Sequence, residues 1–206
     1  MFEWYPATSK LLLEMFRSAI TLAITLFSVS VSVNAHGYVQ EVTLGSTKYT
    51  GYLPYSDPHV PYWNPTPQRI IRKIPGSGPV EDLNSIDLQC NGWTAGGSQY
   101  VGSAPAPLFG TVAAGSQVKL NWTTWPDSHS GPLITYMARA PSDITKWNPG
   151  TSAVWFKVAE AGKDANGKWA ATDNLKATNY IYTFTIPPKL KAGQYIIRHE
   201  RSNKGM

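Results

Sequence analysis

The feature that most constrains the fold is a series of short runs in which apolar and polar residues alternate. In Gln117–Thr123, every second side chain is apolar, so one side of a strand would be buried and the other exposed to solvent. Gly, Pro, Asn and Asp separate the runs, and helical periodicity is almost absent after residue 36. The pattern therefore predicts an all-β fold, an antiparallel β-sandwich. The other strand-like runs are Leu133–Met137, Ala153–Val158, Tyr180–Ile186 and Gln194–Glu200.

One stretch of the sequence is too long for an ordinary connection between strands. Tyr49–Gly97 is rich in Pro, Tyr and Gly. Long loops on a rigid sheet scaffold are often where binding takes place. The 206 residues suffice for one domain of ordinary size.

The N-terminus has the three parts of a secretory signal. Met15-Phe16-Arg17 supplies a basic start, Ala19–Val33 is apolar, and Val33-Asn34-Ala35 suits a cleavage site. We therefore predict a signal peptide over residues 1–35 and a single catalytic domain over residues 36–206. Met15 would be a tidier translation start, and the alternative is a start at Met1 with a long region before the apolar run. The rival interpretation is a membrane anchor, but the apolar run is shorter than the ~20 residues of a spanning helix and is interrupted by Ser and Thr.

The positive charge of the chain raises the question of nucleic-acid binding. The formal net charge is +5, yet only Arg69, Arg72 and Lys73 lie close together. Because the other basic residues are spread thinly, no electrostatic stripe forms. We expect neither nucleic acid nor a membrane among the partners.

Two of the four histidines, His36 and His129, are candidate metal ligands. Cleavage after Ala35 would make His36 the first residue, so that its α-amine and its ring could chelate one metal ion together. A second imidazole would complete a three-nitrogen site, and such tetragonal nitrogen ligation favours Cu(II). His129 lies in a polar turn, Trp125–Pro132, between two predicted strands. The ordinary alternatives are chance placement for His36 and a hydrogen-bonded turn residue for His129.

Blocks of sequence spread over residues 36–200 resemble one known family. They are His36–Val39, Tyr62–Ile70, Arg72–Gly76, Asp87–Gly92, Trp122–Pro132, Tyr136–Ala138, Ala153–Lys157, Gly167–Trp169 and Gly193–Glu200. The chain resembles the fungal lytic polysaccharide monooxygenases of auxiliary activity family 9, formerly glycoside hydrolase family 61. The number and order of the blocks argue against a chance resemblance.

The resemblance implies an immunoglobulin- or fibronectin-like sandwich with long loops and a flat binding face. By position, His36 and His129 would be the catalytic residues and would hold one copper ion per chain. The expected enzyme is secreted and monomeric, and it cleaves cellulose or a related β-1,4-glucan with O₂ or H₂O₂ and an external electron donor. Because scission follows oxidation at C1 or C4, no carboxylate pair is needed. The rings of Tyr38, Tyr62 and Trp63 could stack on sugar faces, or pack within the core or a loop.

The sequence departs from the family after Gln194–Glu200. Family members continue into a segment that carries a histidine and a glutamine beside the copper ligands and an axial tyrosine. Residues 201–206 match none of these, so no residue here is assigned those roles, and His199 is interpreted as a strand residue. The resemblance therefore predicts a chain truncated at its C-terminus. It also predicts an unpaired Cys90, because the family's disulfide partner lies in the missing segment.

Two alternatives to an active enzyme follow from this departure. One is a copper- or carbohydrate-binding protein that is inactive through the truncation, and the other is a chain that fails to fold. Separately, Asn121-Trp122-Thr123 is a glycosylation sequon within a predicted strand, and Asn121 could be modified if it faces solvent.

Overall fold

The computed structural model describes residues 36–61, 64–92 and 104–202. The chain divides into two units, Met1–Val33 and Asn34–Met206, and all described residues belong to the second. The predicted signal peptide over residues 1–35 lies outside the described residues. Within the described part of the chain, no helix is long and apolar enough to cross a membrane.

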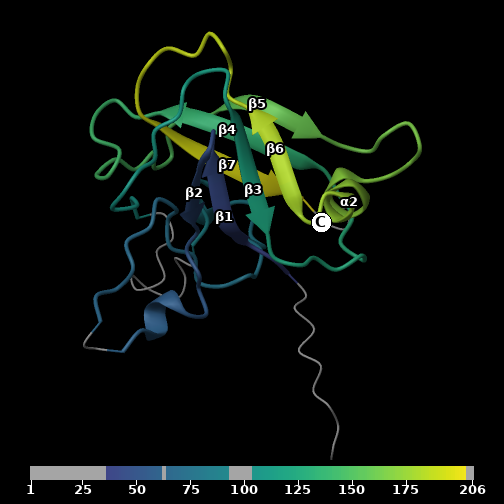
Figure 1. Cartoon of the computed structure of the whole chain (residues 1–206), viewed down its shortest axis with the longest axis horizontal. Helices are drawn as coiled ribbons and strands as arrows, with labels where there is room; N and C mark the ends of the chain where they lie inside the picture. The colour runs from purple at the N-terminus through teal and green to yellow at the C-terminus, as the bar shows by residue number, and fades with distance from the viewer. Residues whose placement is uncertain (1–35, 62–63, 93–103, 203–206) are drawn as a thin grey trace, which may run out of the picture. The chain divides into compact units, whose positions relative to one another are not determined.

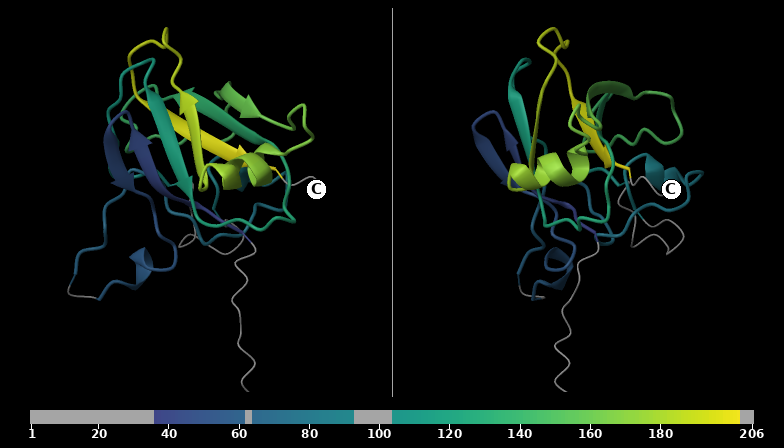
Figure 2. Two further views of the ribbon diagram at one scale, coloured as in Figure 1. Left: turned by 45° about the vertical axis from the view of Figure 1, so that its right-hand side comes forward. Right: turned by 90° about the vertical axis from the view of Figure 1, so that its right-hand side faces the viewer.

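The described residues form two antiparallel sheets that pack face to face (Figures 1 and 2). This arrangement confirms the predicted β-sandwich. The first sheet has the strand order β2 (Thr47–Thr50), β1 (Val39–Leu44), β3 (Gln117–Trp122) and β6 (Ile181–Thr185). The second has the order β5 (Phe156–Ala161), β4 (Leu133–Arg139) and β7 (Tyr195–Arg201).

The core lies between the sheets, and β3 shows why the sequence folds this way. Its apolar residues Val118, Leu120 and Trp122 are buried, whereas Gln117 and Lys119 are exposed on the other face. Burying Val118 and Leu120 contributes ~1.5–3 kcal/mol each. The main core cluster comprises Val42, Leu44, Val118, Leu120, Trp122, Leu175, Phe184 and Ile186, with Val158, Ala159 and Ile197 of the second sheet packed against it.

Several boundaries and elements differ from those predicted. The strand expected over Ala153–Val158 begins only at Phe156, and β1 and β2 were not predicted as strands. A π-helical turn, η5 (Ala170–Asn174), leads into a short helix, α2 (Leu175–Ala177). The helical segment was missed because it is too short to show periodicity, although Ala170, Ala171 and Leu175 are buried against the sandwich.

The long segment after β2 contains no strand in its described residues, as its composition predicted. Its described residues include two 3₁₀ turns, η1 (Asp57–His59) and η2 (Ile86–Leu88). A buried ion pair fixes its first part: Arg69 donates from Nε and Nη2 to the carboxylate of Asp57 at 2.9 and 2.8 Å. These hydrogen bonds hold the pKa of Asp57 below its ordinary value. The pair gives this part of the loop a fixed conformation.

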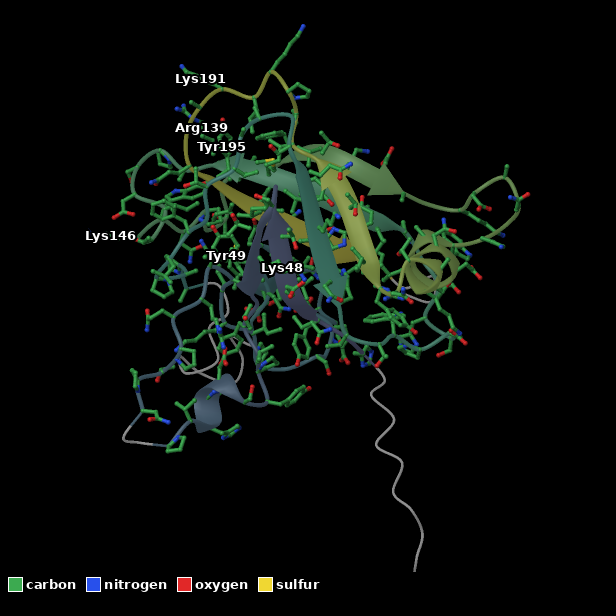
Figure 3. The ribbon with its side chains drawn as sticks, in the orientation of Figure 1. Lys48, Tyr49, Arg139, Lys146, Lys191 and Tyr195 are labelled. Atoms are coloured by element: carbon green, nitrogen blue, oxygen red, sulfur yellow. The ribbon has the colours of Figure 1, made fainter. Side chains whose placement is uncertain are left out.

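The two ends of the sandwich differ in character. At one end, the loop between β6 and β7 closes on itself, since Tyr195 donates to the carbonyl of Lys191 at 2.7 Å (Figure 3). Arg139 at the end of β4 donates to the carbonyl of Ala192 in the same loop at 3.3 Å. β7 then runs from Tyr195 to Arg201 at the other end, where His36 and His129 lie.

Candidate metal centre

The pairing of β1 with β3 brings the two predicted ligands together. Val39 pairs with Trp122, so the residues before β1 lie beside the residues after β3. Two hydrogen bonds extend this pairing: Tyr38 N donates to Thr123 Oγ1 at 3.1 Å, and Thr123 N donates to the Tyr38 carbonyl at 2.9 Å. His36 precedes this ladder and His129 follows it. The β-sheet therefore places both histidines at the same end of the sandwich.

The imidazole rings of His36 and His129 lie close together in an edge-on arrangement. Their centroids are 5.0 Å apart and their planes are nearly perpendicular, at 86°. Ser128 Oγ is 2.9 Å from Nδ1 of His129, which leaves Nε2 as the nitrogen able to bind a metal ion. Burial, followed by the charge of His129, lowers the pKa of His36. Both effects favour the neutral imidazole, which is the form that binds metals.

The indole of Trp125 contacts both histidines. The centroid of its ring lies 6.1 Å from that of His36 and 5.7 Å from that of His129, and both contacts are edge-on. Its Nε1 also donates to the backbone carbonyl of His129 at 3.1 Å. Gly37 lies against the same indole: a Cβ there would be 2.8 Å from Thr123 Oγ1 and 3.1 Å from Trp125. Glycine at position 37 thus allows the chain after His36 to approach β3 closely.

The turn that carries His129 is held from the side by η5 and α2. The backbone N–H of Ala171 donates to the carbonyl of Gly131 at 3.1 Å. Lys176 forms an exposed ion pair with both carboxylate oxygens of Asp127 at 2.9 Å. These contacts attach the turn to the sandwich at points on both sides of His129.

The candidate ligand side chains that the described part of the chain brings together at this end of the sandwich are His36 and His129. Among the described residues, no group of three or more His, Cys, Asp or Glu side chains could hold a metal ion. A metal centre at His36 and His129 would therefore need a ligand that is not one of these side chains. A free α-amine at His36 would be such a ligand.

The comparisons with known proteins identify the family. A model of Auxiliary Activity family 9, formerly GH61, matches residues 36–202. The chain belongs to auxiliary activity family 9. Curated relatives carry the name AA9 family lytic polysaccharide monooxygenase, so the chain is an enzyme of this class. The family's general activity is the oxidative cleavage of polysaccharides.

The match to individual relatives is extensive. The chain is 55% identical over 185 residues to lytic polysaccharide monooxygenase B of Malbranchea cinnamomea, covering 89% of this chain and 71% of that protein. It is 53% identical over 182 residues to the corresponding protein B of Gloeophyllum trabeum, covering 85% of this chain and 69% of the other.

Solved structures agree with the family. The structure of HiLPMO9B is 34% identical with a TM-score of 0.60, covering 80% of this chain and 68% of that one. The extended catalytic domain of H. jecorina LPMO9A has a TM-score of 0.66 at 23% identity and supports the fold alone. The match covers 80% of this chain and 63% of that domain.

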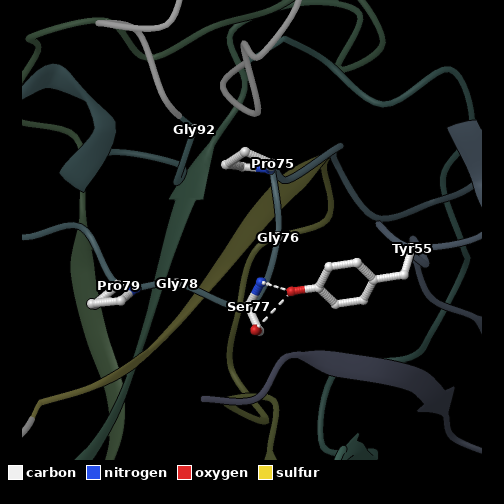
Figure 4. A pocket seen from close by; sticks show the side chains of 7 residues that line it. All are labelled: Tyr55, Pro75, Gly76, Ser77, Gly78, Pro79 and Gly92. Atoms are coloured by element: carbon white, nitrogen blue, oxygen red, sulfur yellow. Dashed lines mark hydrogen bonds between the residues drawn. The ribbon is translucent and has the colours of Figure 1, made fainter. Parts of the chain in front are cut away.

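Of the three aromatic residues predicted to contact substrate in this family 9 chain, one, Tyr38, lies among the described residues. Tyr38 is half-buried, with its ring 6.1 Å from that of Tyr55 in an edge-on contact. Tyr62 and Trp63 lie outside the described residues. Sequence reasoning missed Tyr55, which is 59% exposed. Its hydroxyl accepts from the backbone N–H of Ser77 at 3.0 Å, at the side of a shallow hollow lined also by Pro75, Gly76, Gly78, Pro79 and Gly92 (Figure 4).

The other predicted residues are Asn121, which lies in β3, and Cys90, which follows η2 in the long loop. Asn121 is half-buried in β3, on the same face as the exposed Lys119, so the sequon stays a candidate glycosylation site. Cys90 has a free thiol, and burial raises the pKa of that thiol.

His199 is a residue of strand β7, as predicted, and its side chain lies between the sheets. Its ring stacks on Tyr182 at 4.6 Å, and its Nδ1 is 2.8 Å from Thr135 Oγ1. Burial, followed by the charge of Arg201, lowers its pKa to about 3. His199 is therefore a neutral core residue at ordinary pH.

Proposed function

We propose that the mature chain begins at His36, after removal of a secretory signal over residues 1–35, and that it binds one copper ion. The ligands would be the α-amine and ring of His36 and the ring of His129. The observation that carries the proposal is the approach of the two rings to 5.0 Å. A second supporting observation is that the match to the family model begins at His36 itself.

The donor set at this end of the sandwich fits copper. Two imidazoles and one amine give three nitrogen donors, and tetragonal nitrogen ligation suits Cu(II), which also heads the divalent affinity order. An α-amine has an ordinary pKa near 8, so a metal ion can displace its proton at modest cost. The lowered pKa of His36 reduces the corresponding cost for that ring. Bound copper would supply one-electron chemistry with O₂ or H₂O₂, which oxidative scission at C1 or C4 of a sugar requires.

The role of the protein's own residues is to orient the ligands. Ser128 engages Nδ1 of His129 and so leaves Nε2 as the nitrogen that would bind the metal ion. Trp125 contacts both rings and holds the His129 backbone, which limits how far the rings can rotate. Ligands fixed before the metal binds lose little freedom on binding, and this preorganisation favours tight and specific uptake.

We propose cellulose or a related β-1,4-glucan as the substrate, with an external electron donor. Stacking of sugar rings on aromatic faces would involve Tyr62 and Trp63, and Tyr38 would act with the exposed ring of Tyr55 that it contacts. The protein would act as a secreted, extracellular monomer and would bind neither nucleic acid nor membrane.

The test is the release of oxidised oligosaccharides from cellulose. The chain beginning at His36 would be loaded with copper and incubated with amorphous cellulose, a reductant and H₂O₂, and the soluble products analysed by mass spectrometry. We expect oligosaccharides with ends oxidised at C1 or C4, and none from His129→Ala. Copper uptake without oxidised products would instead identify a copper- or carbohydrate-binding protein without catalysis.

A further inference from the structure

The sandwich contributes a cationic side chain to the candidate metal centre from its second sheet. Arg201 ends β7 and pairs with Leu133, which is 1% exposed. Residues directly opposite each other in a sheet point to the same side, so Arg201 points inward, between the sheets. An arginine at an inward position of a sandwich strand is unusual, because charged side chains are seldom buried unless paired.

Two contacts of the Arg201 guanidinium with described residues lead to the His129 turn. Its guanidinium carbon lies 3.1 Å from the centroid of the Trp125 ring. Its Nη2 donates to the carbonyl oxygen of His129 at 3.0 Å. The same carbonyl accepts from Trp125 Nε1 at 3.1 Å. Arg201 and Trp125 therefore both donate hydrogen bonds to the backbone carbonyl of His129, whose imidazole lies beside that of His36.

The energetics argue against a purely stabilising role for this arginine. None of the ion pairs among the described residues includes Arg201. Its Nε and Nη1 are buried and have no hydrogen-bond partner in the described part of the chain. A buried cation without a carboxylate partner costs more free energy than an apolar side chain of similar size. The contacts of Arg201 with Trp125 and with the His129 carbonyl instead suit a role in orienting the His129 turn.

We propose that Arg201 is a positioning residue of the candidate copper centre. By covering Trp125 and holding the His129 carbonyl, it fixes the direction of the His129 imidazole relative to His36. The inference rests on the proposed function, since it assigns a role toward the same metal. It adds a residue beyond the two proposed ligands, at the end of β7, which belongs to the other sheet from the β1 strand that follows His36.

The experiment compares three variants of Arg201 with a matched control on the same strand. Arg201→Lys keeps the positive charge but loses the planar guanidinium with its several N–H donors. Arg201→Gln keeps a planar amide that can donate hydrogen bonds but carries no charge. Arg201→Met keeps a side chain of similar length without charge or hydrogen-bond donors. The control is Arg198→Lys: Arg198 also stacks on an indole, that of Trp155 at 4.5 Å, but lies on the opposite face of β7. All chains begin at His36.

Two quantities are measured besides the unfolding midpoint. One is the chemical shifts of the His129 ring nitrogens in the metal-free chain, and the other is Cu(II) affinity by competition with a chelator. We expect Arg201→Lys to shift the ring signals and to weaken Cu(II) binding ~10-fold, the lower end of the range for partners that orient metal ligands. Arg201→Gln should retain more affinity than Arg201→Met. Arg198→Lys should leave both readouts unchanged.

Unchanged ring signals and affinity in all Arg201 variants would overturn the proposal. Equal losses in Arg198→Lys and Arg201→Lys would overturn it too, because a general loss of stability would then explain both. The proposed function fails separately, if the wild-type chain binds no copper. The ring signals of the metal-free chain would still test the role of Arg201 in that case.

Discussion

The burial of a neutral imidazole at His199 predicts how stability depends on pH. The folded-state pKa of His199 is lowered to about 3, from an ordinary value of 6.5. In acid the unfolded chain binds a proton at this position and the folded chain does not, so stability falls as the pH falls from 6.5 toward 3. Each pH unit within this window costs about 1.4 kcal/mol. Between pH 7 and pH 4.5, His199 should therefore cost roughly 2–3 kcal/mol of unfolding free energy.

The assay is urea unfolding at these two pH values, for the wild-type chain and for His199→Phe. Phenylalanine keeps an aromatic ring against Tyr182 but cannot bind a proton. It also loses the bond to Thr135, which lowers stability by ~1 kcal/mol at both pH values and leaves the slope unaffected. At pH 4.5 the carboxylate of Asp57, whose pKa is lowered, remains ionised and does not contribute. An equal loss of stability on acidification in both chains would refute the reasoning, since His199 would then not carry the pH dependence.

Three other substitutions test separate parts of the structure. Asp57→Asn should lower the unfolding free energy by ~3 kcal/mol in urea titrations, because it leaves the guanidinium of Arg69 without its buried partner. Gly37→Ala should weaken Cu(II) binding ~10-fold in chelator competition, since the added methyl would displace its neighbours beside the ligands. Lys176→Ala should leave the urea unfolding midpoint nearly unchanged, because its ion pair with Asp127 is exposed to solvent.

The strands of the core could be predicted from the sequence because alternation reports burial directly. The pattern at Val118, Leu120 and Trp122 gave the correct buried face of β3. Alternation does not report which strand pairs with which, so the ladder between Tyr38 and Thr123, 85 residues apart, was not predictable from local pattern. The helical turn at Ala170–Asn174 was missed because five residues are too few to show a period.

The candidate site was predictable to a similar extent. His36 and His129 follow from the cleavage signal, the turn and the resemblance to the family, and the fold brings their rings together. Trp125 gave no chemical signal in the sequence, since an indole in a turn is usually a packing residue. Arg201 gave none either, because its contacts depend on the register of β7 against β4, which only the tertiary structure reveals.

The most direct test of the central claim is a Cu(II) titration of the chain beginning at His36, followed by EPR spectroscopy. The matched control is the same chain with Ala35 retained, which blocks the α-amine of His36 and leaves both imidazoles in place. We predict one tight site per chain with nitrogen hyperfine structure. That spectrum should be lost in His129→Ala and replaced by a weaker, different signal in the chain that retains Ala35. The same affinity and spectrum in the chain that retains Ala35 would contradict a centre built on the N-terminal amine.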